Sequence, residues 1–130
     1  MMSPEKTARL IERHPELLAV PPDTVIAQRG IECGDGWFGL IDDAFTAIEA
    51  HCESNGLPVP AITQVKEKFG KLRVYVKPWD KGIASILDTA ERKSAEICEQ
   101  CGRPGRLVAT PYLHSSCGEH TPPTAELMRR

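Results

Sequence analysis

Two cysteine-bearing stretches decide the fold of this chain: Ile97-Cys98-Glu99-Gln100-Cys101-Gly102-Arg103-Pro104-Gly105 and Cys117-Gly118-Glu119-His120. They read Cys-x2-Cys and Cys-x2-His, with fifteen residues between them. Each half places two ligands on a tight turn, and two such halves close the tetrahedral site that Zn²⁺ prefers. Gly102 follows the second cysteine, where a residue that accepts a positive φ lets backbone N–H groups turn toward sulfur. The spacing therefore predicts a zinc site with four ligands: Cys98, Cys101, Cys117 and His120.

The same residues have other interpretations. Cys98 and Cys101 can be read as ordinary buried thiols or as a redox pair. A redox Cys-x-x-Cys follows a strand and precedes a helix, whereas here a helical pattern precedes Cys98. Four protein ligands leave no open coordination position, so we expect structural rather than catalytic zinc. His114 is the rival fourth ligand, but Cys-x2-His keeps Cys117 and His120 on one turn, which favours His120.

Composition indicates a single domain with a modest core. The chain has 130 residues, a formal net charge of −2, an isoelectric point of about 6.1 and only 5% aromatic residues, so a metal site would supplement a small core. No apolar run reaches the length of a membrane span, and residues 1–6 lack the apolar core of a signal peptide. The cysteines, mostly in the zinc pattern, fit a reducing compartment better than a disulfide framework. We expect a cytoplasmic protein without a membrane partner.

Local patterns predict two helices in the first half of the chain. Ser3-Pro4 starts a helix that breaks near His14-Pro15. A second helix is expected to have its cap at Asp35 and to end at Asn55-Gly56. Its apolar residues recur at helical spacing: Ile41, Phe45, Ile48 and Cys52.

A β-hairpin and a third helix are predicted next. Residues 62–68 and 72–77 flank a turn at Phe69-Gly70-Lys71, and the second run alternates apolar and polar residues, as a half-buried strand does. A helix with apolar positions from Ile83 to Ile97 leads into Cys98. We expect residues 106–109 to form a short strand and residues 121–124 to precede a short helix or a tail.

The predicted fold class is α+β. Amphipathic helices pack on a small antiparallel β-hairpin, and a treble-clef-like or ribbon-like zinc module follows. Residues 1–97 form the helical and hairpin body and residues 98–130 form the zinc-binding module. We expect the two to fold as one cooperative domain.

Three motifs that lie far apart in the sequence resemble those of a known group of proteins. They are Gly30-Ile31-Glu32-Cys33-Gly34-Asp35-Gly36-Trp37, Val65-Lys66-Glu67-Lys68-Phe69-Gly70-Lys71-Leu72-Arg73-Val74-Tyr75-Val76, and the first zinc stretch with its Cys117–His120 partner. In this order they resemble a group of small uncharacterised proteins encoded by bacteriophages and prophages. The chain departs from that pattern at Lys71, where a second glycine is expected. The resemblance implies a phage context and a zinc site, and by analogy a protein that binds and redirects or blocks host machinery, including defence systems.

Enzymatic residues are not indicated by the sequence. Acidic residues cluster between positions 32 and 53, but Asp42 and Glu49 fall on one side of a helix whose other side is apolar, as a solvated helix face does. No Walker loop, Gly-x-Ser-x-Gly, His-Glu-x-x-His or zinc-deaminase pattern is present in the sequence. Cys33 lies beside a predicted helix start, where the dipole would favour thiolate, but we prefer a small buried hydrophobe packed under Trp37. We expect a non-enzymatic protein, with an enzyme of unknown class as the third alternative.

Partner binding is therefore the expected function. A host protein is the preferred partner, nucleic acid is the alternative, and head-to-tail self-association would suit a chain with an acidic helix and a basic hairpin. Net charge −2 weighs against nucleic acid. We expect at least one large aromatic to be exposed as an interface anchor. The candidate partner-binding residues are Trp37, Lys66, Lys68, Lys71, Arg73, Tyr75, Lys77 and Trp79.

Overall fold

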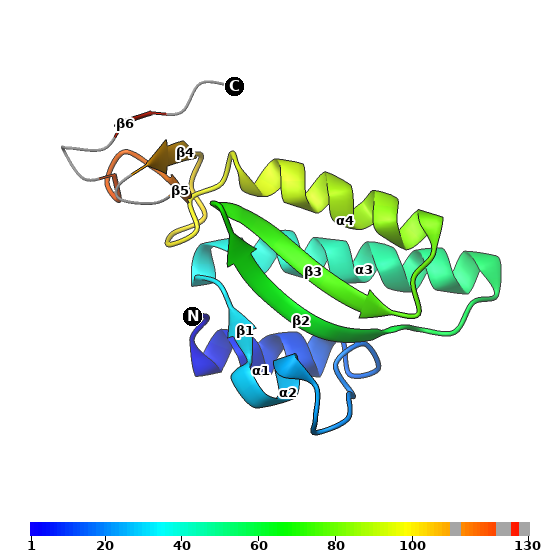
Figure 1. Cartoon of the computed structure of the whole chain (residues 1–130). Helices are drawn as coiled ribbons and strands as arrows, with labels where there is room; N and C mark the ends of the chain where they lie inside the picture. Colours follow the sequence, from blue (N-terminus) through cyan, green and yellow to red (C-terminus); the bar gives the residue numbers. More distant parts are fainter. Residues whose placement is uncertain (110–112, 122–125, 128–130) are drawn as a thin grey trace.

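The computed structural model describes residues 1–109, 113–121 and 126–127 (Figure 1). Its helices are α1 (Pro4–Arg13), α2 (Val25–Arg29), α3 (Phe38–Asn55) and α4 (Lys81–Ser94), with a 3-10 helix η1 (Asp35–Trp37) before α3. The strands form two sheets, ordered β1-β2-β3 and β5-β4-β6. The predicted mixed α+β class is confirmed. The strand bounds are β1 (Ile31–Glu32), β2 (Ala61–Lys68), β3 (Lys71–Lys77), β4 (Arg106–Ala109), β5 (Leu113–Ser116) and β6 (Glu126–Leu127).

The first two predicted helices are present, but Asp35 does not cap the second one. The Ser3 side chain accepts the Lys6 N–H at the start of α1, and Gly56 ends α3 with a left-handed φ of 63°. Asp35 instead begins η1, and its carboxylate accepts the Ser3 backbone N–H at 2.7 Å. The predicted cap therefore joins the start of α1 to the segment before α3.

The predicted hairpin is confirmed, with a tighter turn than expected. Phe69 and Gly70 form a two-residue turn with φ values of 54° and 81°, as primed hairpin turns require. Lys71 pairs with Lys68 as the first residue of β3, so the turn itself contains a single glycine. The sequence did not indicate β1, a two-residue strand that pairs parallel with β2 through Ile31↔Val65 and Glu32↔Lys66. Two residues are too few to show a period.

The end of the chain differs from its prediction in three places. Helix α4 ends at Ser94, before Ile97, which forms an isolated bridge with Pro104. The expected strand at 106–109 is β4, and it pairs with β5, which was not predicted. Where a short helix or tail was expected after residues 121–124, residues 126–127 form strand β6 on β4. Residues 122–124 themselves lie outside the described part of the chain.

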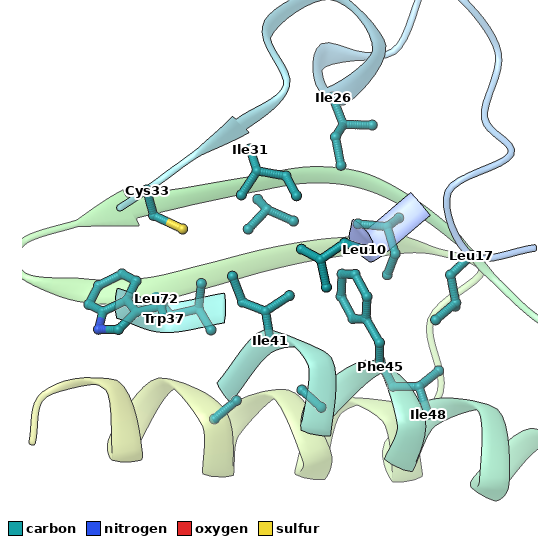
Figure 2. Close-up of a cluster of buried hydrophobic side chains, with 14 of the residues drawn as sticks. Leu10, Leu17, Ile26, Ile31, Cys33, Trp37, Ile41, Phe45, Ile48 and Leu72 are labelled. Carbon is teal, nitrogen blue, oxygen red and sulfur yellow. The ribbon is translucent and has the colours of Figure 1, made fainter. Parts of the chain in front are cut away.

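One hydrophobic core joins the first sheet to the helices. Figure 1 shows the β2–β3 hairpin lying across α3, with α4 beside it. Side chains from the sheet, α1 and α3 fill the space between them, and Trp37 lies at one end of the cluster (Figure 2). The largest fully buried side chains are Trp37, Phe45, Leu10, Leu17, Ile31, Ile41, Ile48, Ile62 and Leu72.

A buried histidine holds α1 against α3. The His14 ring is only 2% exposed, packs edge-on against Phe45, and lies between two carboxylates of α3. Its Nε2 is 2.7 Å from Asp42 and its Nδ1 is 2.9 Å from Glu49. Each ring nitrogen therefore has a carboxylate oxygen of α3 as its hydrogen-bond partner. The face that we expected to be solvated is therefore partly an interhelical contact.

We predict that His14→Ala lowers the free energy of unfolding by about 2 kcal/mol or more, because the substitution leaves two carboxylates without their shared donor and a gap beside Phe45. Urea unfolding at neutral pH measures this. Arg13→Ala is the matched control. Arg13 also bonds Asp42, at 2.7 Å, but its side chain is 52% exposed, so its loss should cost less than about 1 kcal/mol. Equal effects of the two substitutions would contradict the buried contact.

Acid should weaken the same contact. Burial alone would raise the pKa of Asp42, but hydrogen bonds from Arg13 and His14 and their charges hold it below its ordinary value of 3.8. A carboxyl with a depressed pKa in the folded state stabilises the fold above its ordinary pKa, and this contribution is lost as the pH falls through the folded value. Asp42→Asn should therefore flatten the decline of stability with falling pH below about pH 4.

Candidate metal centre

The four predicted ligands meet in one cluster. The ligand atoms of Cys98, Cys101, Cys117 and His120 all lie within 4.8 Å of one another. His120 Nδ1 is 3.4 Å from the Cys98 sulfur and 3.1 Å from the Cys117 sulfur, and the Cys101 and Cys117 sulfurs are 3.5 Å apart. Tetrahedral Zn²⁺, with bonds of about 2.3 Å to sulfur and about 2.0 Å to nitrogen, separates its ligands by similar distances. The cluster could hold a metal ion, and its donor set is consistent with zinc.

The first ligand pair lies on a tight turn of the backbone. The Cys98 N–H donates to the Arg103 carbonyl at 2.8 Å, and the Gly102 N–H donates to the Cys98 carbonyl at 2.9 Å. Gly102 has a φ of 81°, which confirms the positive φ predicted for this position. We call residues 98–102 the knuckle.

The second ligand pair comes to the knuckle through β4 and β5. Arg106 pairs with Ser116 across these strands, so Cys117 returns beside the start of β4. The His120 N–H donates to the Cys117 carbonyl at 3.2 Å and keeps both ligands on one turn, as predicted. Cys98 and Cys117 are buried, His120 is half-buried and Cys101 is exposed. The site therefore lies at the surface with two sulfurs facing the protein.

The surroundings of Cys117 favour its thiolate form. Burial raises the pKa of this thiol, but hydrogen bonds from the His120 backbone and ring and from the neighbouring cysteines outweigh burial and lower it to about 6. Thiolate is the form that binds metal. A positively charged ion would lower the pKa of the Cys117 thiol further.

The knuckle docks on the segment before α3. The Gly36 N–H donates to the Glu99 carbonyl at 2.7 Å, the Gly34 N–H donates to the Glu99 carboxylate at 2.8 Å, and the Trp37 indole N–H donates to the Ile97 carbonyl at 2.9 Å. A Cβ at Gly36 would lie 2.2 Å from the Cys98 carbonyl oxygen and 2.5 Å from the Gly102 nitrogen. Only glycine allows this approach of two backbones.

The hairpin turn reaches the same place. The Ser115 hydroxyl donates to the Gly70 carbonyl at 2.6 Å, and the Glu99 N–H donates to the Ser115 carbonyl at 3.1 Å. A Cβ at Gly70 would lie 2.6 Å from Leu107. The three motifs, which are far apart in the sequence, therefore meet at the cluster of cysteine and histidine ligands.

Trp37 was a candidate partner-binding residue, and the structure contradicts that placement. It is fully buried, because its ring fills the core while its N–H is used by Ile97. A partner cannot reach it. Trp79 and Tyr75 are 65% and 41% exposed, so the expectation of an exposed large aromatic is confirmed.

The structure also decides between the alternatives for His114 and Cys33. The metal cluster contains His120 and not His114. Cys33 is buried, and burial together with the negative charge of Glu99 raises its pKa to about 12. The preferred interpretation of Cys33 as a core thiol fits this environment, and a reactive thiolate does not.

Comparisons of the chain with protein-family models, with curated proteins and with solved structures gave no match. Among the described residues, none of the helices has the length and apolarity needed to cross a membrane.

We predict about one zinc ion per chain, bound by three sulfurs and one nitrogen, which X-ray absorption on metal-replete protein measures directly. His120→Ala should weaken zinc binding at least tenfold in competition with a chelating dye, whereas His114→Ala should bind zinc as tightly as the unsubstituted chain. A shell with two sulfurs, stoichiometric iron, or equal losses in the two variants would contradict this site.

We further predict that Gly36→Ala destabilises the protein by more than about 2 kcal/mol and weakens zinc binding, because the added methyl group displaces the knuckle. Gly39→Ala is the matched control. Gly39 lies in α3 with nothing within 4 Å of an added Cβ, so alanine there should stabilise the helix by about 0.5 to 1 kcal/mol. Thermal unfolding and zinc titration check both variants. Unchanged zinc affinity in Gly36→Ala would show that the docking does not support the site.

Proposed function

We propose that this chain is a non-enzymatic accessory protein of bacteriophage type, which binds an acidic surface of a host protein in the host cytoplasm. Its contact surface is the outer face of the β2–β3 hairpin, and the metal, taken as zinc, is structural. In host takeover or counter-defence, such binding would redirect or block the partner. The zinc part, a knuckle followed by a β4–β5 hairpin and a second ligand turn, fits a treble-clef-like or ribbon-like module.

One observation carries the proposal: the cations of the hairpin share one face of the sheet. Directly opposed residues of an antiparallel pair point to the same side. Lys66 is opposite Arg73, and Lys68 is opposite Lys71. By alternation Tyr75 and Lys77 lie on this side too, while Leu72, Val74 and Val76 face the core. We call the set Lys66, Lys68, Lys71, Arg73, Tyr75 and Lys77 the basic face.

Most of the charge on the basic face is available to a partner. Arg73 pairs with Glu91 at 3.2 Å. Within the described residues, the four lysines of the face form no ion pair. A sheet face with several lysines that form no ion pair attracts an acidic surface and speeds its encounter.

The non-enzymatic part of the proposal rests on how the reactive groups are used. The metal cluster supplies four protein ligands, which fill a tetrahedral shell. Asp42 and Glu49, the two acidic residues considered for acid–base chemistry, both bond His14. The cytoplasmic part rests on the cysteines, all five of which are free thiols, as a reducing compartment favours.

Affinity capture from bacterial cells tests this function, with nuclease treatment in one arm. We expect a host protein that remains bound after nuclease and is lost from a variant with Lys66→Glu and Lys68→Glu. A control variant with Arg9→Glu and Lys81→Glu changes the net charge equally at exposed positions of two helices and should keep the partner. Capture that ignores the reversal on the basic face would contradict the proposal.

Single-stranded nucleic acid is the second candidate, because the exposed Tyr75 ring lies among the cations and could stack a base. The net charge of −2 disfavours it. We predict only weak binding to DNA or RNA oligonucleotides, with a Kd above about 10 μM at physiological salt. Sub-micromolar binding that falls steeply with salt, or loss of every captured partner on nuclease treatment, would replace the first candidate by the second.

A further inference from the structure

Strand β3 has a free edge. It is the last strand in the order β1-β2-β3, so only one of its sides is paired. Lys68 and Lys71 flank a two-residue turn and form a hydrogen-bonded pair, so the backbone groups of Lys71, Arg73 and Tyr75 point toward β2. Those of Leu72, Val74 and Val76 point away from β2.

One hydrogen bond confirms this direction. The Leu72 N–H donates to the Ser94 hydroxyl of α4 at 2.8 Å, so α4 covers the edge at that end. Farther along β3, within the described part of the chain, no hydrogen bond is made by the edge-facing backbone groups of Val74 and Val76. Unpaired groups of this kind are a template for another strand.

A groove runs along the open part of this edge. Its volume is about 280 Å³. Val74 and Val76 form one side, and Ala84 and Leu87 of α4 form the other. Figure 1 shows α4 beside β3. Trp79 also lines the groove and is 65% exposed.

We propose that an extended segment of the partner, with alternating acidic and apolar residues, adds to β3 as a fourth strand in the groove between β3 and α4. Main-chain hydrogen bonds to Val74 and Val76 supply the pairing, as in other cases of strand addition. This inference rests on the proposed function and names how the partner is held.

The alternation follows from the two sides of the added strand. Side chains on one side would lie beside Arg73, Tyr75 and Lys77 of the basic face, which favours carboxylates. Those on the other side would lie in the groove against Val76 and Leu87, which favours apolar groups. Asp88 and Glu91 also line the groove and would repel acidic residues there, so the two kinds of side chain are not exchangeable.

A second copy of this chain fits the same edge poorly. Two β3 strands side by side would bring the cations of both basic faces together, and like charges on neighbouring strands destabilise the pairing. Lysines on an edge strand oppose self-association in this way. They do not oppose an acidic strand.

The test uses ¹⁵N-labelled zinc-bound protein and an acetylated seven-residue peptide of alternating glutamate and valine. We expect saturable shifts and slowed hydrogen exchange of the Val74 and Val76 amides, with a Kd below about 1 mM.

Two further peptides test which N–H groups of the added strand face β3. One is N-methylated on all valines and the other on all glutamates, so each lacks the N–H groups on one side of its backbone. One should bind and the other should lose at least tenfold in affinity, because only one set of peptide N–H groups faces β3. Shifts confined to the lysines of the basic face, equal binding of both methylated peptides, or dimerisation of the free protein through β3 would overturn the proposal.

A protein variant separates this proposal from the proposed function. Val74→Pro removes an edge-facing N–H and leaves the β2 pairing intact, and proline is tolerated on edge strands. We expect it to lose at least tenfold in peptide affinity. If the Lys66→Glu and Lys68→Glu variant loses the captured host protein but a folded Val74→Pro retains it, strand addition is wrong and the basic face stands. If the peptide binds at Val74 but no host protein is captured, the proposed function is wrong and strand addition stands. The methylated peptides decide the question if Val74→Pro fails to fold.

Discussion

The docking of the knuckle on Gly34–Trp37 is the constraint on which the rest of the structure depends. Two backbones approach so closely there that a methyl group at Gly36 would meet the Cys98 carbonyl. The same segment supplies Trp37 to the end of the core and leads directly into α3. A single contact thus fixes the metal cluster, the start of the longest helix and the largest buried side chain. A metal ion bound by these four residues would therefore support the packing of the core, and the core would support the site.

The spacing of the cysteines and His120 made the candidate metal ligands predictable. The periodicity of apolar residues made the longer helices and strands predictable. Cys98 and His120 are assigned by local turns, whose geometry depends on few residues. Helix α1 has a clear start signal at Ser3. Helix α3 has a clear stop signal, and Gly56 takes the left-handed conformation that such a stop implies. These features depend on neighbours in the sequence, so a single sequence contains them.

Features that depend on distant neighbours were not predictable. The two-residue β1 exists because β2 pairs with it, and its own residues carry no strand period. Trp37 is buried and donates its N–H to Ile97, sixty residues away, whereas the sequence alone left it among the candidate partner-binding residues. The clamp of His14 by Asp42 and Glu49 likewise joins two helices. The edge of β3 is free because the sheet ends there, and the residues of β3 alone do not indicate where the sheet ends.

The late position of the second ligand pair has a consequence for biosynthesis. Gly34 and Gly36 leave the ribosome long before Cys117 and His120, yet their partner Glu99 lies on the turn from Cys98 to Cys101, which meets those two residues in the cluster. A nascent chain can therefore form α3 and the hairpin early, but their shared end must wait for the last ligands. Until then we expect the apolar surface around Trp37 to stay uncovered, which makes it a site for chaperone engagement during synthesis.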